Sequence, residues 1–144
     1  MTAPESDLKA QEIAQAMYDL DYASQHLGVE LLSVTPGHAT LRMPLVDWMF
    51  NGHGTCHGGI IFMLADTAFA YSCNSYNLRT VAQQCSITFL APGRPGEVLL
   101  AEAKEVARAG RSGIYDIEVR TEQGEVLAQF RGNSRTISGT VIPE

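Results

Sequence analysis

The feature that most constrains this chain is a long apolar segment that carries one acidic residue. Residues 58–74 read GGIIFMLADTAFAYSCN, which is apolar nearly all around a helix. A helix at a protein surface shows a polar face, so this segment is predicted to be a buried helix around which other elements pack. We expect this central helix over about 58–74, with Asp66 near its middle.

The chain after Thr80 alternates apolar and polar residues with a period of two, which is typical of half-buried strands. The alternation is clearest at 84–89, 115–120 and 126–131. Turn-forming sequences divide the region into about four strands. These sequences are PGRPG at 92–96, AGRSG at 109–113 and EQGE at 122–125. Because the turns are short, we expect an antiparallel meander.

The first part of the chain predicts one helix and one hairpin. Apolar residues recur at helical spacing over about 7–20, and Ser6 is a candidate N-cap, so we expect a surface helix there. Segments 29–34 and 39–45 flank the turn sequence PGH and are predicted to form the hairpin. In its second strand, four alternating residues should face the core: Ala39, Leu41, Met43 and Leu45.

Together these elements predict an α+β fold in which an antiparallel β-sheet wraps around a long central helix, the architecture called the hotdog fold. The 144 residues suffice for one domain and are too few for two of ordinary size, so we expect a single domain over 1–144. No apolar run reaches the roughly 20 residues of a membrane span, and the N-terminus lacks a signal or transit pattern. We therefore expect a cytoplasmic protein without a membrane partner, and the three unpaired cysteines agree with a reducing compartment.

Charge limits the partners of this chain. The formal net charge of −6 disfavours a nucleic-acid partner, which would require a basic face. The charge is unevenly distributed, because residues 1–66 hold eight acids and two bases, whereas residues 67–144 hold eight of each. We expect an anionic ligand to bind the second part.

Two glycines open the predicted central helix, and their backbone groups are candidates for carbonyl recognition. The first N–H groups of a helix have no partner within it, and the helix dipole adds partial positive charge. Glycine also lets a substrate approach the backbone closely, so the turn His57-Gly58-Gly59 is a candidate oxyanion hole for acyl chemistry. The alternative is that Gly58 and Gly59 only allow the helix to start against a packed sheet.

Asp66 is the stronger indication of a functional site. An unpaired carboxylate is costly to bury, so such a group is usually paired, protonated or functional. Eight residues of helix separate Gly58 from Asp66 by about 12 Å, too far for both to act on one carbonyl. Two copies with antiparallel helices would place Gly58 of one beside Asp66 of the other, which predicts an active site shared across a homodimer.

Other candidates are weaker. His53, Cys56 and His57 lie in one tight loop without a distant ligand, so we expect no metal site. Cys56 and His57 are adjacent and no acid is evident to orient the imidazole, which disfavours a nucleophile–base pair. Asn51 could hold the loop or a water. Gln83 has the parity of Cys85, so it is expected to point at the helix and to need a polar partner there.

The stretch NGHGTCHGGIIFMLADTAFAYSCNS resembles the hotdog-fold acyl-CoA thioesterases and, within them, the phenylacetyl-CoA thioesterases of bacterial phenylacetate degradation. The resemblance continues through AQAMYDLD, FLAPG, GIYDIEV and FRGNS and covers nearly the whole chain. It implies a homotetramer of two dimers, no metal or organic cofactor, and hydrolysis of an aryl-acetyl thioester of coenzyme A.

The resemblance also implies roles for single residues. The Gly58 N–H would polarise the thioester carbonyl, and Asp66 of the facing subunit would be general base or nucleophile. His57 and Asn51 would shape the pocket. We further expect substrate contacts from Gly59, Thr67 and Gln83. The arginines in or beside the turns of the basic part, Arg94, Arg108 and Arg111, are candidates for the coenzyme A phosphates, with solvated turn residues as the alternative.

Two other functions stay open at this level. An acyl-thioester dehydratase or hydratase would use His57 and Asp66 as a proton-transfer pair on the same fold. A noncatalytic acyl-CoA-binding module would bind the thioester without cleaving it. Stoichiometric release of free thiol with acid separates the hydrolase from both.

Overall fold

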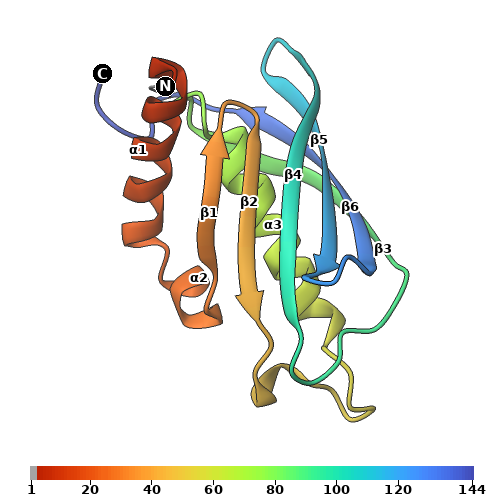
Figure 1. Ribbon diagram of the computed structural model, residues 1–144. Coiled ribbons are helices and arrows are strands. Elements are labelled where there is room, and N and C mark those ends of the chain that lie inside the picture. Colours follow the sequence, from red (N-terminus) through yellow and green to blue (C-terminus); the bar gives the residue numbers. More distant parts are fainter. Residues whose placement is uncertain (1–2) are drawn as a thin grey trace.

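The computed structural model describes residues 3–144 and shows six antiparallel strands wrapped around one long helix, α3 (Figure 1). The helices are α1 (Glu5–Leu20), α2 (Tyr22–Leu27) and α3 (Gly58–Cys73), with a short 3-10 helix, η1, at Asp47–Met49. The strands are β1 (Glu30–Thr35), β2 (His38–Pro44), β3 (Thr80–Phe89), β4 (Val98–Ala109), β5 (Ser112–Thr121) and β6 (Val126–Thr136). Their order in the sheet is β1-β2-β4-β5-β6-β3, so β1 and β3 form the two edges. The predicted hotdog architecture is confirmed, but the expected meander holds only for β4, β5 and β6, because β3 pairs with β6 and not with β4.

The core lies between α3 and the concave face of the sheet. Leu64, Ala65 and Ala68 on α3 are fully buried, as the apolar pattern of the segment predicts. The alternating residues of β2, β4 and β5 that face them are buried to the same degree: Ala39, Leu41, Met43, Leu99, Ala101, Ala103, Ile117 and Val119. Each large side chain buried in this way contributes about 1.5–3 kcal/mol to folding. The core therefore fixes the position of α3 across the sheet and, with it, the positions of Gly58 and Asp66.

Strand β3 is less buried than its sequence pattern suggests. It lies at the sheet edge with β6 as its one neighbour, so Cys85 and Ile87 are half-buried and Phe89 is 50% exposed. The register with β6 shifts between Ala82 and Gln84, which leaves Gln83 as an extra residue in a β-bulge. Gln83 is exposed in the protomer, and its side chain has no hydrogen-bond partner within residues 3–144, so the polar partner expected at the helix is not found. The bulge changes the alternation that the prediction assumed to be continuous.

The N-terminal region differs from prediction at its boundaries. Helix α1 ends at Leu20 as expected but begins at Glu5, because the Pro4 carbonyl already accepts the N–H groups of Asp7 and Leu8. Ser6 lies inside the first turn, so the predicted Ser6 cap is wrong; proline suits a helix start because it has no N–H to satisfy. A second helix, α2, was not predicted. It is capped by the Asp21 carboxylate, which accepts the Ser24 N–H at 3.1 Å.

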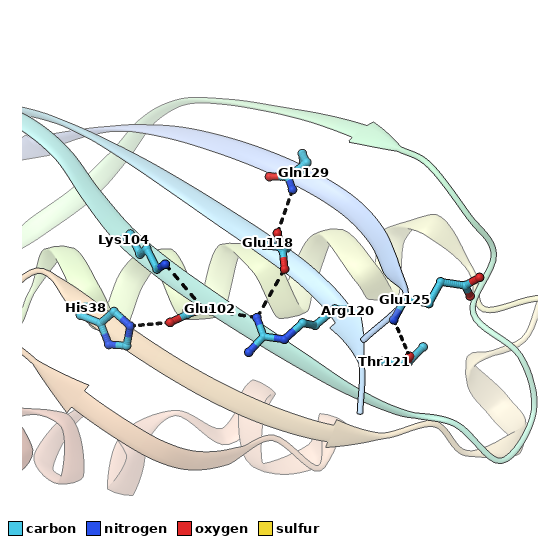
Figure 2. Close-up of polar contacts among 8 residues, drawn as sticks. All are labelled: His38, Glu102, Lys104, Glu118, Arg120, Thr121, Glu125 and Gln129. Carbon is cyan, nitrogen blue, oxygen red and sulfur yellow. Dashed lines mark hydrogen bonds and ion pairs between the residues drawn. The ribbon is translucent and has the colours of Figure 1, made fainter. Parts of the chain in front are cut away.

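The convex face of the sheet, opposite α3, carries a network of charged side chains (Figure 2). Glu102 on β4 is its centre: its carboxylate lies 2.9 Å from His38 Nε2 and 3.3 Å from Arg120 Nη1. The hydrogen bond from His38 holds the pKa of Glu102 below its usual value. Arg131 on β6 likewise pairs with Asp116 on β5 at 2.6 Å. Several cations of the basic part of the chain are therefore occupied by acids of the same sheet.

None of the helices within residues 3–144 combines the length and the apolar character that crossing a membrane requires.

Candidate active site

The loop before α3 is held by Asn51. Its side-chain oxygen accepts hydrogen bonds from the N–H of His53 at 2.9 Å and from the N–H and hydroxyl of Thr55, both at 3.3 Å. The Asn51 N–H donates to the Thr55 carbonyl at 2.9 Å, which closes the loop. Asn51 was expected to hold either the loop or a water. In the structure its side-chain oxygen holds the loop. The loop in turn sets where α3 begins.

His57 caps α3 and binds the backbone N–H of one of the two glycines but not of the other. Its Nδ1 accepts the Gly59 N–H at 2.9 Å, which makes His57 the side-chain N-cap of the helix. The Gly59 N–H is therefore already used. The Gly58 N–H, in contrast, has no hydrogen-bond partner in the part of the chain that the structure describes. One donor is left free at the positive end of the helix dipole.

A cleft of about 360 Å³ opens beside this free donor. It is lined by Thr55, Cys56, Gly58 and Ile61 and by residues 89–92. Burial raises the pKa of the Cys56 thiol to about 11, so the thiol is protonated at neutral pH and is not an activated nucleophile. This agrees with the expectation against a Cys56–His57 pair. The cleft offers an apolar space with one backbone donor at its wall.

Asp66 lies two turns further along α3 and is half-buried. Within residues 3–144 its carboxylate has neither a hydrogen-bond donor nor a cation as partner. Burial raises its pKa above the ordinary value, because removal from water disfavours the charged form. The carboxylate is close enough to Cys73 and Cys85 for its charge to raise the pKa of both thiols beyond the effect of burial.

Asp66 belongs to a stripe of α3 that the protomer leaves partly uncovered. The half-exposed residues of the stripe recur at helical spacing: Phe62, Met63, Asp66 and Ala70. The helix is unbroken from Gly58 to Cys73, so the free N–H and the carboxylate stay about 12 Å apart along its axis. One protomer therefore does not bring the two groups together on one reacting atom.

Comparison with known proteins shows the family of this chain. The family model described as Thioesterase superfamily matches residues 53–128. Acyl-coenzyme A thioesterase PaaI of Escherichia coli K12 is 45% identical over 136 residues, covering 94% of this chain and 97% of that protein. This chain belongs to the thioesterase superfamily. The predicted family and the predicted activity class, a thioester hydrolase, are confirmed.

Solved structures extend the comparison of this thioesterase to three dimensions. The E. coli PaaI protein from the phenylacetic acid degradation operon superimposes with a TM-score of 0.92 at 45% identity, covering 93% of this chain and 97% of that one. A mutant of the phenylacetic acid degradation protein PaaI from Thermus thermophilus matches with a TM-score of 0.78 at 32% identity, covering 81% and 100%. A Streptococcus mutans protein bound to acetyl-CoA matches with a TM-score of 0.74 at 26% identity, covering 78% and 90%.

The three candidate arginines of the thioesterase lie at opposite ends of α3. Arg94 is exposed. It lies near the cleft at the start of α3, because the carbonyl of the neighbouring Gly93 accepts the Cys56 N–H at 2.8 Å. Arg108 and Arg111 line a hollow with Cys73, about 22 Å along the helix from Gly58. Arg108 is engaged there, pairing with Glu105 at 3.1 Å and lying 3.6 Å over the Tyr76 ring. The structure does not bring the three arginines together within one protomer.

Two further candidates can be placed. The Thr67 hydroxyl donates to the Met63 carbonyl at 2.7 Å inside its own helix, and the side chain is 9% exposed. A substrate therefore has little access to Thr67 within the protomer. Sequence reasoning assigned no site role to Phe89, which lines the cleft next to Gly58. The one available signal was its place at the start of the FLAPG turn sequence. No group of three or more metal-ligating side chains occurs within residues 3–144.

Replacing the capping histidine should weaken the start of α3. We expect His57→Ala to lower the free energy of unfolding by about 0.5–2 kcal/mol, because the Gly59 N–H loses its acceptor. His57→Asn supplies another side-chain acceptor and should retain most of the stability. Urea unfolding of both variants measures the effect, with the exposed loop variant His53→Ala as control. Equal stability of His57→Ala and His53→Ala would contradict the capping role.

Asp66 should make stability depend on pH in a defined direction. Burial raises the pKa of Asp66 in the folded state above its value in the unfolded chain, about 3.8. The stability linked to its protonation is therefore fully present below about pH 3.8 and is lost as the pH rises through the pKa of the folded state. Asp66→Asn should therefore be more stable than the natural protein at pH 7 and similar to it near pH 3.5. Urea midpoints at one protein concentration test this, with exposed Asp47→Asn as control. A stability difference that is the same at both pH values would contradict the account.

Proposed function

We propose that this thioesterase hydrolyses aryl-acetyl-CoA thioesters, with phenylacetyl-CoA as the representative substrate, to the free acid and coenzyme A. The observation that carries the proposal is the free Gly58 N–H, which opens onto an apolar cleft at the start of α3. The names of its relatives support the substrate class, because the E. coli protein is an acyl-CoA thioesterase from the phenylacetic acid degradation operon.

The chemistry follows from two groups. The Gly58 N–H binds the carbonyl oxygen and stabilises the negative charge that develops on it as the carbonyl carbon is attacked. The Asp66 carboxylate either removes a proton from the attacking water or attacks the carbonyl itself. The carbon–sulfur bond then breaks, and the coenzyme A thiolate leaves and takes up a proton. Where Asp66 attacks the carbonyl itself, a water then hydrolyses the resulting acyl–aspartyl anhydride, which releases the free acid and restores the carboxylate. A thioester is less resonance-stabilised than an oxygen ester, so these groups suffice without a serine triad.

We infer that the minimal active unit is a homodimer. Antiparallel packing of two α3 helices would cover the stripe of Phe62, Met63, Asp66 and Ala70 and place Asp66 of one protomer beside Gly58 of the other. The sheet supports this arrangement, because β3 is an edge strand whose unpaired backbone groups and exposed Val81 are free to meet a second copy. Association of two such dimers into a tetramer follows from the resemblance to the family.

In this dimer, the candidate arginines near one active site come from both protomers. With Gly58 beside the partner's Asp66, the C-terminal end of the partner's α3 extends about 10 Å beyond Gly58. Arg94 of one protomer and Arg111 of the partner would then lie on the same side of the reacting carbonyl. We propose these two as ligands of the coenzyme A phosphates, whereas Arg108 is held by Glu105 and Tyr76. A cytoplasmic location agrees with this substrate and with the free cysteines Cys56, Cys73 and Cys85.

Trapping of released thiol tests the proposed reaction. Purified protein incubated with phenylacetyl-CoA should release free thiol and phenylacetic acid in equal amounts. A dehydratase or hydratase would change the acyl chain without releasing thiol, and a binding module would leave the thioester intact. Either outcome would overturn the proposal.

The Gly58 N–H can be removed with little change in backbone shape. Proline is favoured at the first position of a helix, and His57 already has the extended backbone (φ −59°, ψ 132°) that a following proline requires. We expect Gly58→Pro to fold and to lower kcat by about 10²–10³-fold, the usual cost of one lost oxyanion donor. Gly58→Ala keeps the N–H and adds the same steric contact, an atom 3.1 Å from the Phe89 ring, so it is the matched control. Equal kcat in the two variants would contradict the role of the N–H.

A further inference from the structure

The ring of Phe89 lies directly against the start of α3. A Cβ placed on Gly58 would lie 3.1 Å from Cζ and 3.3 Å from Cε1 of that ring. The tip of the ring therefore packs on the residue whose N–H is free. This contact joins the last residue of β3 to the first residue of α3, which are 31 positions apart in the sequence.

Phe89 is held firmly by its backbone, yet its side chain is not buried. The residue pairs with Ala128 on β6, and the Leu90 and Ala91 N–H groups both donate to the Leu127 carbonyl, at 2.8 and 3.3 Å. The ring follows the inward parity of Cys85 and Ile87, but it is 50% exposed because the cleft of about 360 Å³ lies beside it. An anchored aromatic side chain on the wall of an apolar cleft is suited to contact a bound apolar group.

We propose that Phe89 is a specificity-determining residue that selects aromatic over aliphatic acyl groups, an inference that rests on the proposed function. A carbonyl bound at the Gly58 N–H has its acyl carbons within reach of the ring, because the ring packs on Gly58 itself. Two aromatic rings prefer edge-to-face or offset contacts with centroids about 4.5–7 Å apart and gain from them beyond the area that they bury. A phenyl group one carbon removed from the carbonyl can make such a contact.

The other walls of the cleft explain why this preference depends on Phe89. Among the described residues that line the cleft, Phe89 is the only aromatic one. Ile61 and Leu90 bury apolar surface, and this favours an aliphatic chain and a phenyl ring alike. Within the part of the cleft that one protomer supplies, the ring of Phe89 is therefore the group that can discriminate between the two acyl classes.

The test compares two substrates of similar acyl length, phenylacetyl-CoA and hexanoyl-CoA. In Phe89→Leu, which keeps an apolar side chain, the ratio of kcat/KM for phenylacetyl-CoA to that for hexanoyl-CoA should fall by about 2- to 10-fold. The hexanoyl-CoA value should change by less than about 2-fold. Phe89→Tyr keeps the ring and should retain the natural ratio. Val106→Ala, an exposed apolar position of β4 away from the cleft, is the control that should change neither substrate.

Because β3 is an edge strand, the oligomeric state of each variant is measured alongside by light scattering. If Phe89→Leu does not fold, Phe89→Ile serves as the second non-aromatic variant with the same expected loss. An unchanged ratio of the two kcat/KM values in a folded non-aromatic variant would overturn the proposal. An equal fall in kcat/KM for both substrates would also overturn it, because it indicates a structural role for Phe89. Absence of phenylacetyl-CoA hydrolysis by the natural protein would instead overturn the proposed function, so the two failures are distinguishable.

Discussion

The structure depends on burying α3, and α3 carries a carboxylate with no partner among the described residues of its own protomer. An apolar helix is what allows a curved sheet to close around it, and hydrophobic burial is the main stabilising contribution. Asp66 opposes that contribution, because desolvation raises its pKa and makes its charged form less favourable than it is in water. Such a group is chemically useful, since a base with a raised pKa accepts a proton more readily near neutral pH. Stability given up at Asp66 is consistent with a catalytic position.

The start of α3 shows how a small number of polar contacts leaves one donor available. Asn51 fixes the loop, and His57 takes the Gly59 N–H as a cap, so the Gly58 N–H is the group left without a partner in the described chain. The ring of Phe89 packs beside Gly58 and adds an apolar wall next to this donor. A donor in an apolar, partly dehydrated place binds a developing oxyanion more strongly than it would in open water.

Much of the fold could be predicted because its signals are local. The apolar pattern located α3 within one residue of its observed C-terminal end, and alternation placed Ala39, Leu41 and Met43 in the core. The errors came from features that depend on pairing or on competing caps. The bulge at Gln83 depends on register with β6, and Pro4 supplied the helix start that Ser6 was expected to supply. Gly58 and Asp66 could be proposed from spacing, whereas Phe89 enters the site through a contact between distant segments.

The central claim is that each active site takes its oxyanion donor from one chain and its carboxylate from the other. The most direct measurement is the thioesterase activity of a purified heterodimer, assembled from differently tagged Gly58→Pro and Asp66→Asn chains. One of its sites carries both lesions and the other carries neither. The account predicts that each homodimer is nearly inactive and that the heterodimer recovers about half of the natural activity per dimer. A verified heterodimer that stays at background would contradict the shared site.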